Sequence, residues 1–206
     1  MAVRAAVPPG RAGRLWLRDR IEVATRGRDQ LDRKLRLLLP EAARLRAAAE
    51  QQRAEWRTAF QDGQLWRLRA GLVGGQDALR RSLPAAPARM SSALLTVMGV
   101  SYPSDVAVQA PPEAVLPPDT VAAEQAAESF RRAVTAGART AAADESVRRV
   151  EEEIAATRRR YRALDRRWLP YLTAALAALD IALAQEEQDD SARRRAATGR
   201  DATARA

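Results

Sequence analysis

Apolar residues recur at alternating steps of three and four near both ends of the chain. The first repeat covers residues 17–59 and is broken at Arg28 and Gln52. The second covers residues 147–182 and is broken at Thr157. This heptad spacing places one apolar stripe along each helix, and such a stripe needs a partner. The pattern therefore predicts two long helices that pack against each other.

The segment between these helices, residues 73–120, has a different character. It contains Gly74, Gly75 and several prolines, together with two β-favouring runs, LLTVMGV and DVAVQA. We expect a β-hairpin over about residues 94–110, with the intervening SYPS as its turn and Gly99 as a bulge or close approach. A short helix is expected at 79–83. This segment is interpreted as a small head.

The expected fold is all-α, a long antiparallel two-helix coiled coil with a small middle head that contains the hairpin. The predicted segments are an irregular N-terminus (1–10), a first helix (11–72), the head (73–120), a second helix (121–188) and a basic tail (189–206) that is disordered in isolation. Pro40 and Pro170 lie inside the helices, and a kink is expected at Pro40.

Because the head returns the chain, residues that face each other should have numbers that add up to about 195, to within about five. This register places Gly27 and Arg28 opposite Trp168. The Arg28 guanidinium then either stacks on the indole or extends outward along the edge of the helix pair. Pro40 is expected to face Thr157.

Composition excludes several kinds of chemistry. The chain has no cysteine and no histidine, so it lacks a thiol nucleophile and the commonest general base and metal ligand. The sequence contains no phosphate-loop motif. It also contains no paired carboxylates, because the consecutive glutamates 151–153 spread around a helix. We therefore expect no catalytic residue, no metal and no cofactor. The first residues lack the apolar run of a secretory signal, and the run 169–184 is too short and too interrupted for a membrane span.

The formal net charge is +9, and Lys34 is the only lysine. The densest basic cluster is TRRRYRALDRRW, residues 157–168, in which Arg158, Arg162 and Arg166 follow one face of a helix. Such a stripe is compatible with a nucleic acid, an acidic surface on a partner protein or solvent. Periodicity does not decide among these three.

Three motifs in matching order resemble the D subunit of the V-type and A-type rotary ATPases, the central rotor shaft. The resemblance covers most of the chain, from Pro9 to about Gln188. The first helix contributes Pro9, Leu15, Leu17, Ile21, Ala24, Gly27, Leu31 and Lys34. The head contributes Met98, Gly99, Val100 and Pro103. The last helix contributes Glu153, Ile154, Thr157, Arg158, Arg159, Arg160, Ala163, Leu164, Asp165 and Pro170. The chain departs from the family pattern at Arg162, where asparagine is usual, at Pro40, and in a tail without phenylalanines.

The resemblance implies a non-catalytic shaft of the central stalk that transmits torque between ATP turnover and ion translocation. Its partners would be the A and B subunits of the catalytic hexamer, the F subunit of the central stalk, and the funnel-shaped C (d-type) subunit above the membrane ring. Its location would be cytoplasmic and peripheral to the membrane. No nucleic-acid contact is implied; a basic coiled-coil scaffold or nucleic-acid-binding protein is the alternative. The residues expected at partner interfaces are Leu15, Leu17, Ile21, Gly27, Lys34, Met98, Gly99, Arg158, Arg159, Arg160, Arg162, Trp168 and Pro170.

Overall fold

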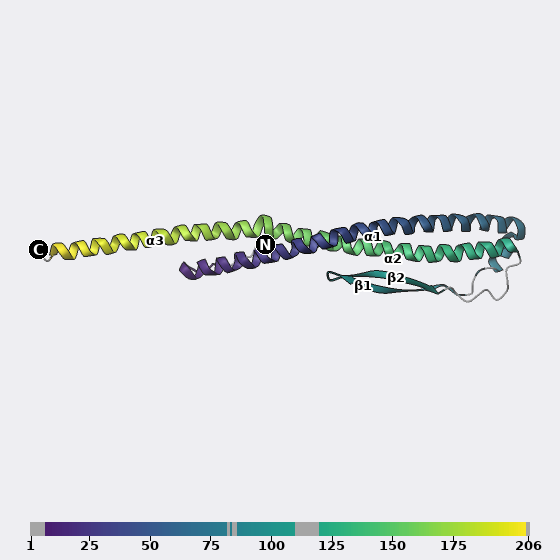
Figure 1. Cartoon of the computed structure of the whole chain (residues 1–206), viewed down its shortest axis with the longest axis horizontal. Helices are drawn as coiled ribbons and strands as arrows, with labels where there is room; N and C mark the ends of the chain where they lie inside the picture. Colours follow the sequence, from purple (N-terminus) through teal and green to yellow (C-terminus); the bar gives the residue numbers. More distant parts are fainter. Residues whose placement is uncertain (1–6, 82, 84–85, 110–119, 205–206) are drawn as a thin grey trace. The chain divides into compact units, whose positions relative to one another are not determined.

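The computed structural model describes residues 7–81, 83, 86–109 and 120–204 (Figure 1). The elements in chain order are α1 (Gly10–Arg81), β1 (Arg89–Val97), β2 (Val100–Gln109), α2 (Val121–Ala163), the π-helical η1 (Leu164–Trp168) and α3 (Leu169–Ala204). The prediction of a long N-terminal helix, a long C-terminal helix and a small hairpin between them is confirmed. The chain divides into two compact units, residues 34–156 and residues 1–33 with 157–206.

Some sequence predictions fall outside the described residues. These are the first six residues of the irregular N-terminus, the end of the hairpin at residue 110, the part of the head at residues 111–119 and the last two residues of the tail.

Helix α1 continues through Pro40, and its break lies at Gly75 instead. Gly75 has φ 69° and ψ −175°, a conformation that is essentially restricted to glycine. At Gly74 an added Cβ would lie 2.7 Å from the Ala78 Cβ, so this position also requires glycine. The pair therefore redirects the chain, and α1 resumes as far as Arg81. Thr120 then caps α2, since the Ala123 backbone N–H donates to its hydroxyl at 3.1 Å.

The predicted position of the hairpin turn is wrong. The turn consists of Met98 and Gly99, both with positive φ (51° and 79°), and the SYPS segment lies within β2. Two positive φ values are the requirement of a type I′ turn, which matches the twist of the strands. Pro103 is tolerated inside β2 because it pairs with Leu94 next to a register shift that lies between Ser92 and Leu94.

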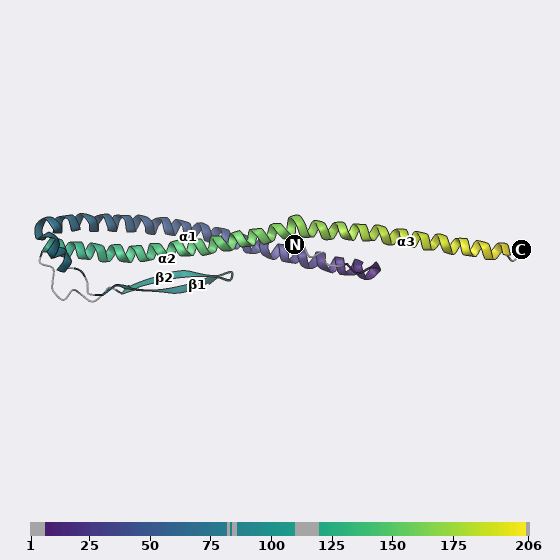
Figure 2. The same cartoon turned by 180° about the vertical axis from the view of Figure 1, so that it is seen from behind.

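The core of the unit of residues 34–156 combines α1, α2 and the hairpin. Two hairpin residues, Val100 and Tyr102, are buried in one apolar cluster with residues of both helices. The helix residues of this cluster are Leu38, Ala42, Leu45, Val150 and Ile154. The hairpin lies alongside the two helices in both views (Figures 1 and 2). β2 thus packs as a third element against α1 and α2.

The other unit, residues 1–33 and 157–206, has its own apolar cluster. Leu17, Ala24 and Leu172 are buried there, with Trp16, Ile21, Leu164, Trp168 and Leu176 among the residues packed against them. Between α2 and α3 the backbone forms the π-helical η1, in which the Leu169 N–H donates to the Leu164 carbonyl. Pro170 follows directly. A proline clashes with the carbonyl four residues before it, and a π turn widens the helix at that point.

The register across this unit lies within the predicted range, since Arg14 pairs with Asp180 and Arg28 lies near Asp165, but the residue opposite Gly27 differs from the prediction by about one helical turn. Gly27 faces Leu164, whose Cδ1 lies 3.6 Å from an added Cβ, and the prediction that it faces Trp168 is wrong. Arg28 pairs with Asp29 at 2.9 Å and with Asp165 at 3.8 Å. Trp168 stacks instead on Tyr171, with ring centroids 5.8 Å apart.

The segment after residue 188 also differs from its prediction. The sequence predicted a tail that is disordered in isolation, and the structure continues α3 to Ala204. Every described side chain from Ala184 to Ala196 is exposed. Local contacts such as Ser191 Oγ to the Glu187 carbonyl at 2.7 Å follow the helix itself. No packing face therefore holds this helical end within the described part of the chain.

Candidate functional site

The described side chains do not form a metal-binding cluster. Among the described residues no group of three or more histidine, cysteine, aspartate or glutamate residues could hold a metal ion. One helical stretch, Val121–Ala196, contains a window that is long and apolar enough to cross a membrane by length and composition alone. This is weak evidence, since helices of soluble proteins also pass that test. The candidate sites are therefore surfaces that could contact other proteins.

Five of the thirteen predicted interface residues point into the chain's own helix packing. Leu17 is fully buried, and Ile21 and Trp168 pack against the same cluster. Gly27 lies against Leu164. The Lys34 Nζ donates to Glu153 Oε1 at 2.8 Å across α1 and α2. These residues contribute to the packing of the helices; Leu17 is fully buried, whereas Ile21, Gly27, Lys34 and Trp168 are partly exposed.

The other predicted residues are accessible or lie at the hairpin turn. Leu15 and Met98 are exposed hydrophobic residues, and Gly99 forms the turn beside Met98. Pro170 is exposed at the start of α3. The remaining four, Arg158, Arg159, Arg160 and Arg162, are exposed on α2.

We call six exposed arginines on α2 and η1 the arginine surface: Arg158, Arg159, Arg160, Arg162, Arg166 and Arg167. At about 100° per residue they cover roughly half of the helix circumference, on the side away from Thr157, Leu164 and Trp168. Within the described part of the chain, five of them have no carboxylate partner: Arg158, Arg159, Arg162, Arg166 and Arg167. The one acidic residue in the segment, Asp165, lies 3.8 Å from Arg28.

This concentration of charge is unfavourable in the isolated chain. Arg158 and Arg162 are four residues apart, as are Arg162 and Arg166, and like charges at this spacing destabilise a helix. Carboxylates on another molecule would remove that repulsion and satisfy the planar guanidinium groups. The arrangement is thus suited to bind an acidic surface that extends around the outer half of the helix.

The second candidate region is the hairpin where it docks on α1 and α2. Tyr102 is buried, and its hydroxyl donates to Glu41 Oε1 at 2.5 Å. Glu41 also accepts from Arg44, at 2.6 Å and 3.0 Å. The Arg44 guanidinium, and then the Tyr102 hydroxyl, hold the pKa of the Glu41 carboxyl below its usual value. Burial raises the pKa of Tyr102, and the neighbouring Glu41 carboxylate adds to the rise.

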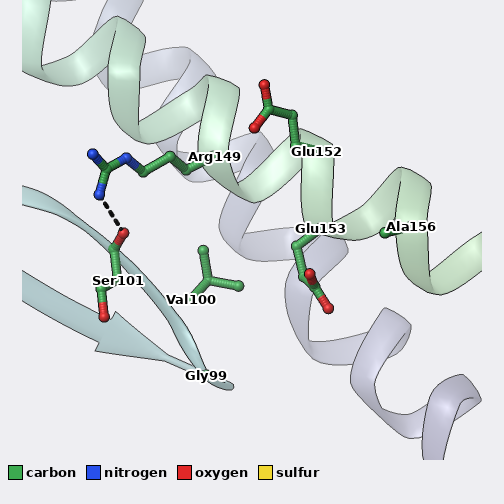
Figure 3. Close-up of a pocket in the computed structure, with 7 residues that line it drawn as sticks. All are labelled: Gly99, Val100, Ser101, Arg149, Glu152, Glu153 and Ala156. Carbon is green, nitrogen blue, oxygen red and sulfur yellow. Dashed lines mark hydrogen bonds between the residues drawn. The ribbon is translucent and has the colours of Figure 1, made fainter.

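A shallow pocket lies between the hairpin tip and α2, with a volume of about 410 Å³ (Figure 3). Gly99, Val100 and Ser101 form its hairpin side, and Arg149, Glu152, Glu153 and Ala156 form its helix side. Its charged side chains are already engaged. Arg149 donates to the Ser101 carbonyl at 3.0 Å and to Glu145 at 2.6 Å. Arg148 and Arg149 lower the pKa of Glu145 to about 2.

The hairpin contacts were not identified from the sequence. Tyr102, Glu41 and Ser146 carry no motif of their own, and assigning SYPS to the turn removed Tyr102 from consideration as a core residue. The available signal was the Met98–Gly99 pair, because glycine is favoured in a two-residue hairpin turn. Placing the turn there would have put Val100 and Tyr102 on one face of β2.

Comparison with protein families gives one match over most of the chain. The family model described as the D subunit of ATP synthase matches residues 15–198. A comparison with curated proteins found no match. The matched range includes most of α1 and α3, and all of α2, the hairpin and the arginine surface.

Proposed function

The chain belongs to the ATP synthase D-subunit family, and from this premise we propose that it is the central-stalk rotor shaft of a V/A-type rotary ATPase. The family is a stalk component of a membrane-bound complex to which it is peripheral, and it is not the catalytic subunit. In our proposal the shaft transmits torque between ATP turnover in the hexamer of A and B subunits and ion movement through the membrane ring. ATP chemistry belongs to the hexamer.

The observation that best supports this role is the antiparallel pairing of helices within each unit. In residues 34–156, Arg46 pairs with Glu151 at 2.6 Å and Arg53 with Asp144 at 2.8 Å. In the other unit, Arg14 pairs with Asp180 at 2.8 Å. Exposed ion pairs contribute little stability, but together with the buried residues they fix the register. Two helices held in register resist sliding past each other when one end is turned.

The arginine surface is our proposed contact with the catalytic hexamer. It covers about half of the helix circumference rather than one narrow face, as expected for a surface that meets several subunits in succession. Acidic side chains of the A and B subunits are its proposed partners. The exposed Met98 at the hairpin tip and the head region are proposed to face the F subunit and the funnel-shaped C subunit.

Co-expression of the chain with its A, B and F partners tests the proposal. We expect a complex that co-purifies, and an ATPase rate of the A/B hexamer that changes when the chain is withheld. A chain that does not enter the complex would contradict the proposal, as would a hexamer whose rate is the same with and without it.

The arginine surface has its own matched test. Arg158→Gln with Arg162→Gln removes two cations that have no carboxylate partner among the described residues. Arg131→Gln with Arg148→Gln removes two cations that pair with glutamates of the chain. Both variants lose two charges. We expect weaker, less salt-sensitive binding to the A/B hexamer for the first variant, and near-native binding for the second. Equal effects would show that only net charge matters.

The alternative of a nucleic-acid-binding protein makes a different prediction. It requires binding to duplex DNA or RNA with a steep dependence on salt, mediated by the same arginines. On our proposal, binding to duplex is weak and does not compete with assembly of the A/B complex. A competition experiment with duplex at physiological salt separates the two.

A further inference from the structure

The two strands of the hairpin are exposed to different extents. On β2, Val100 and Tyr102 are buried, whereas on β1 every residue from Arg89 to Thr96 is exposed. The exposed residues include large apolar ones, with Met90 58% and Leu94 64% exposed. The hairpin therefore meets the helices through β2 and presents β1 to its surroundings.

The strand register identifies which backbone groups of β1 point away from β2. Leu94 pairs with Pro103, and proline has no N–H, so this pair is of the non-hydrogen-bonded kind. The two kinds alternate along an antiparallel ladder, which makes Thr96–Ser101 non-hydrogen-bonded as well. The N–H and C=O groups of Leu94 and Thr96 consequently point outward along the free edge of the sheet.

The corresponding outward groups of β2 are covered by α2. The Ser101 carbonyl accepts a hydrogen bond from Arg149 at 3.0 Å, and the Pro103 carbonyl accepts one from Ser146 at 2.7 Å. Among the described residues, no hydrogen bond reaches the outward backbone groups of Leu94 or Thr96. The chain itself thus satisfies the outward carbonyls of Ser101 and Pro103 on β2, whereas no described group does so for Leu94 and Thr96 on β1.

β1 also lacks the features that normally protect an edge strand. Proteins block such edges with proline, with charged side chains or with a covering element. The strand RMSSALLTV has no proline, and Arg89 at its first position is its only charged residue. The single bulge of the hairpin adds its extra residue to β2, between Pro103 and Val106, and leaves β1 regular.

We propose that β1 receives an extended segment of a partner protein of the complex as a third strand, an inference that rests on the proposed function. The occupant is defined by the edge: a stretch of extended backbone that exchanges hydrogen bonds with Leu94 and Thr96. Its side chains on the two faces of the sheet lie beside the exposed Leu94 and the 44% exposed Leu95. A short segment with apolar residues at adjacent positions therefore fits this edge.

Hydrogen exchange tests this inference on the assembled complex. In the free chain, the amides of Leu94 and Thr96 exchange rapidly, while those of Leu95 and Val97 are protected by β2. On assembly with the A, B, F and C subunits, we expect the Leu94 and Thr96 amides to become protected at least about tenfold. Unchanged exchange in a complex that forms normally would overturn the inference and leave the proposed function standing. If no complex forms, both fail.

A proline substitution separates backbone pairing from side-chain contact. Leu94→Pro removes the outward N–H without removing a bond to β2, and Leu94→Ala removes the side chain but keeps that N–H. We expect Leu94→Pro to weaken binding of the partner that protects β1 by about three- to tenfold more than Leu94→Ala does. Equal effects of the two variants would contradict strand addition.

Self-association is the competing occupant. If the isolated chain shows protection of Leu94 and Thr96 that increases with its own concentration, together with a dimer in sedimentation, the edge binds a second copy and the inference of a partner strand is wrong. We expect no such concentration dependence.

Discussion

The Tyr102 hydroxyl lies 2.5 Å from Glu41 Oε1, and this contact joins the middle of the hairpin to α1. Arg44 also donates to this carboxylate, so Glu41 binds both a neighbouring residue of α1 and a buried residue of β2. Around this contact, Leu38, Ala42, Leu45 and Val150 form the apolar cluster. Docking of the hairpin therefore combines one charge-assisted hydrogen bond with a small buried core.

Removing the tyrosine hydroxyl tests the polar part of this docking. Tyr102→Phe leaves the ring in place and deletes a donor to a charged acceptor, so we expect a loss of about 1.5–3 kcal/mol in the free energy of unfolding. Urea denaturation monitors the change. As a control, Tyr171→Phe alters an exposed tyrosine that stacks on Trp168 and should change stability by less than about 0.5 kcal/mol. Equal losses of free energy of unfolding in the two variants would contradict a stabilising hydrogen bond between Tyr102 and Glu41.

The apolar part is tested by two neighbouring leucines of α1. Leu38 is 0% exposed and Leu37 is 54% exposed. We expect Leu38→Ala to cost about 2–5 kcal/mol through lost burial and a residual cavity, and Leu37→Ala to cost less than about 1 kcal/mol. The same denaturation experiment reports both. If Leu37→Ala reduced the free energy of unfolding as much as Leu38→Ala, a different face of α1 would pack against the core than the one described.

The lowered pKa values of Glu41 and Glu145 predict a dependence of stability on pH. Both glutamates are stabilised in the charged form by neighbouring arginines, and Tyr102 assists at Glu41. A carboxyl whose folded pKa lies below its ordinary value of 4.5 contributes stability that is complete above that value and is lost as the pH falls through the folded pKa. We therefore expect constant stability from pH 7 to about 5.5 and a decline between about pH 4.5 and 2.

Glu145→Gln tests directly whether Glu145 contributes to the decline in stability between about pH 4.5 and 2. It should flatten part of the acid decline while leaving the neutral-pH hydrogen bonds of Tyr102 in place. NMR titration of the Glu145 carboxyl should give a midpoint near 2, and a midpoint near 4.5 would contradict the ion pairs with Arg148 and Arg149.

Two glycines should respond in opposite ways to substitution by alanine. At Gly27 the new Cβ would make an ordinary contact of 3.6 Å with Leu164, and alanine favours a helix by about 0.5–1 kcal/mol. Gly99 has φ +79°, which alanine adopts at a cost of about 1 kcal/mol or more. Thermal unfolding of both variants measures the difference. A stabilised Gly99→Ala would contradict the type I′ turn.

Heptad spacing was sufficient to predict the two long helices, because a sustained apolar stripe has few other stable arrangements. It was not sufficient for the register at Gly27. A sum of about 195 fixes facing residues only to within about one helical turn, and Leu164 rather than Trp168 lies opposite Gly27. The sequence thus predicted which helices pair more accurately than which residues face each other.

The position of the hairpin turn was also not determined by the local sequence alone. Both SYPS and Met98–Gly99 are acceptable turns by composition, and the choice depends on burying Val100 and Tyr102 against helices that are distant in the sequence. The interface residues divide for a related reason. Leu17 and Gly27 belong to motifs, but motif membership does not distinguish a residue that packs within the chain from one that contacts a partner.

The central claim is that the chain turns within its complex, and rotation can be observed directly. Because the chain contains no cysteine, Gln61→Cys, at an exposed position of α1, provides a unique attachment site for a bead on a complex immobilised through its A subunits. Our account predicts continuous rotation of the bead in one direction when ATP is added, and no rotation without ATP. A bead that stays fixed while the same complexes hydrolyse ATP would contradict it.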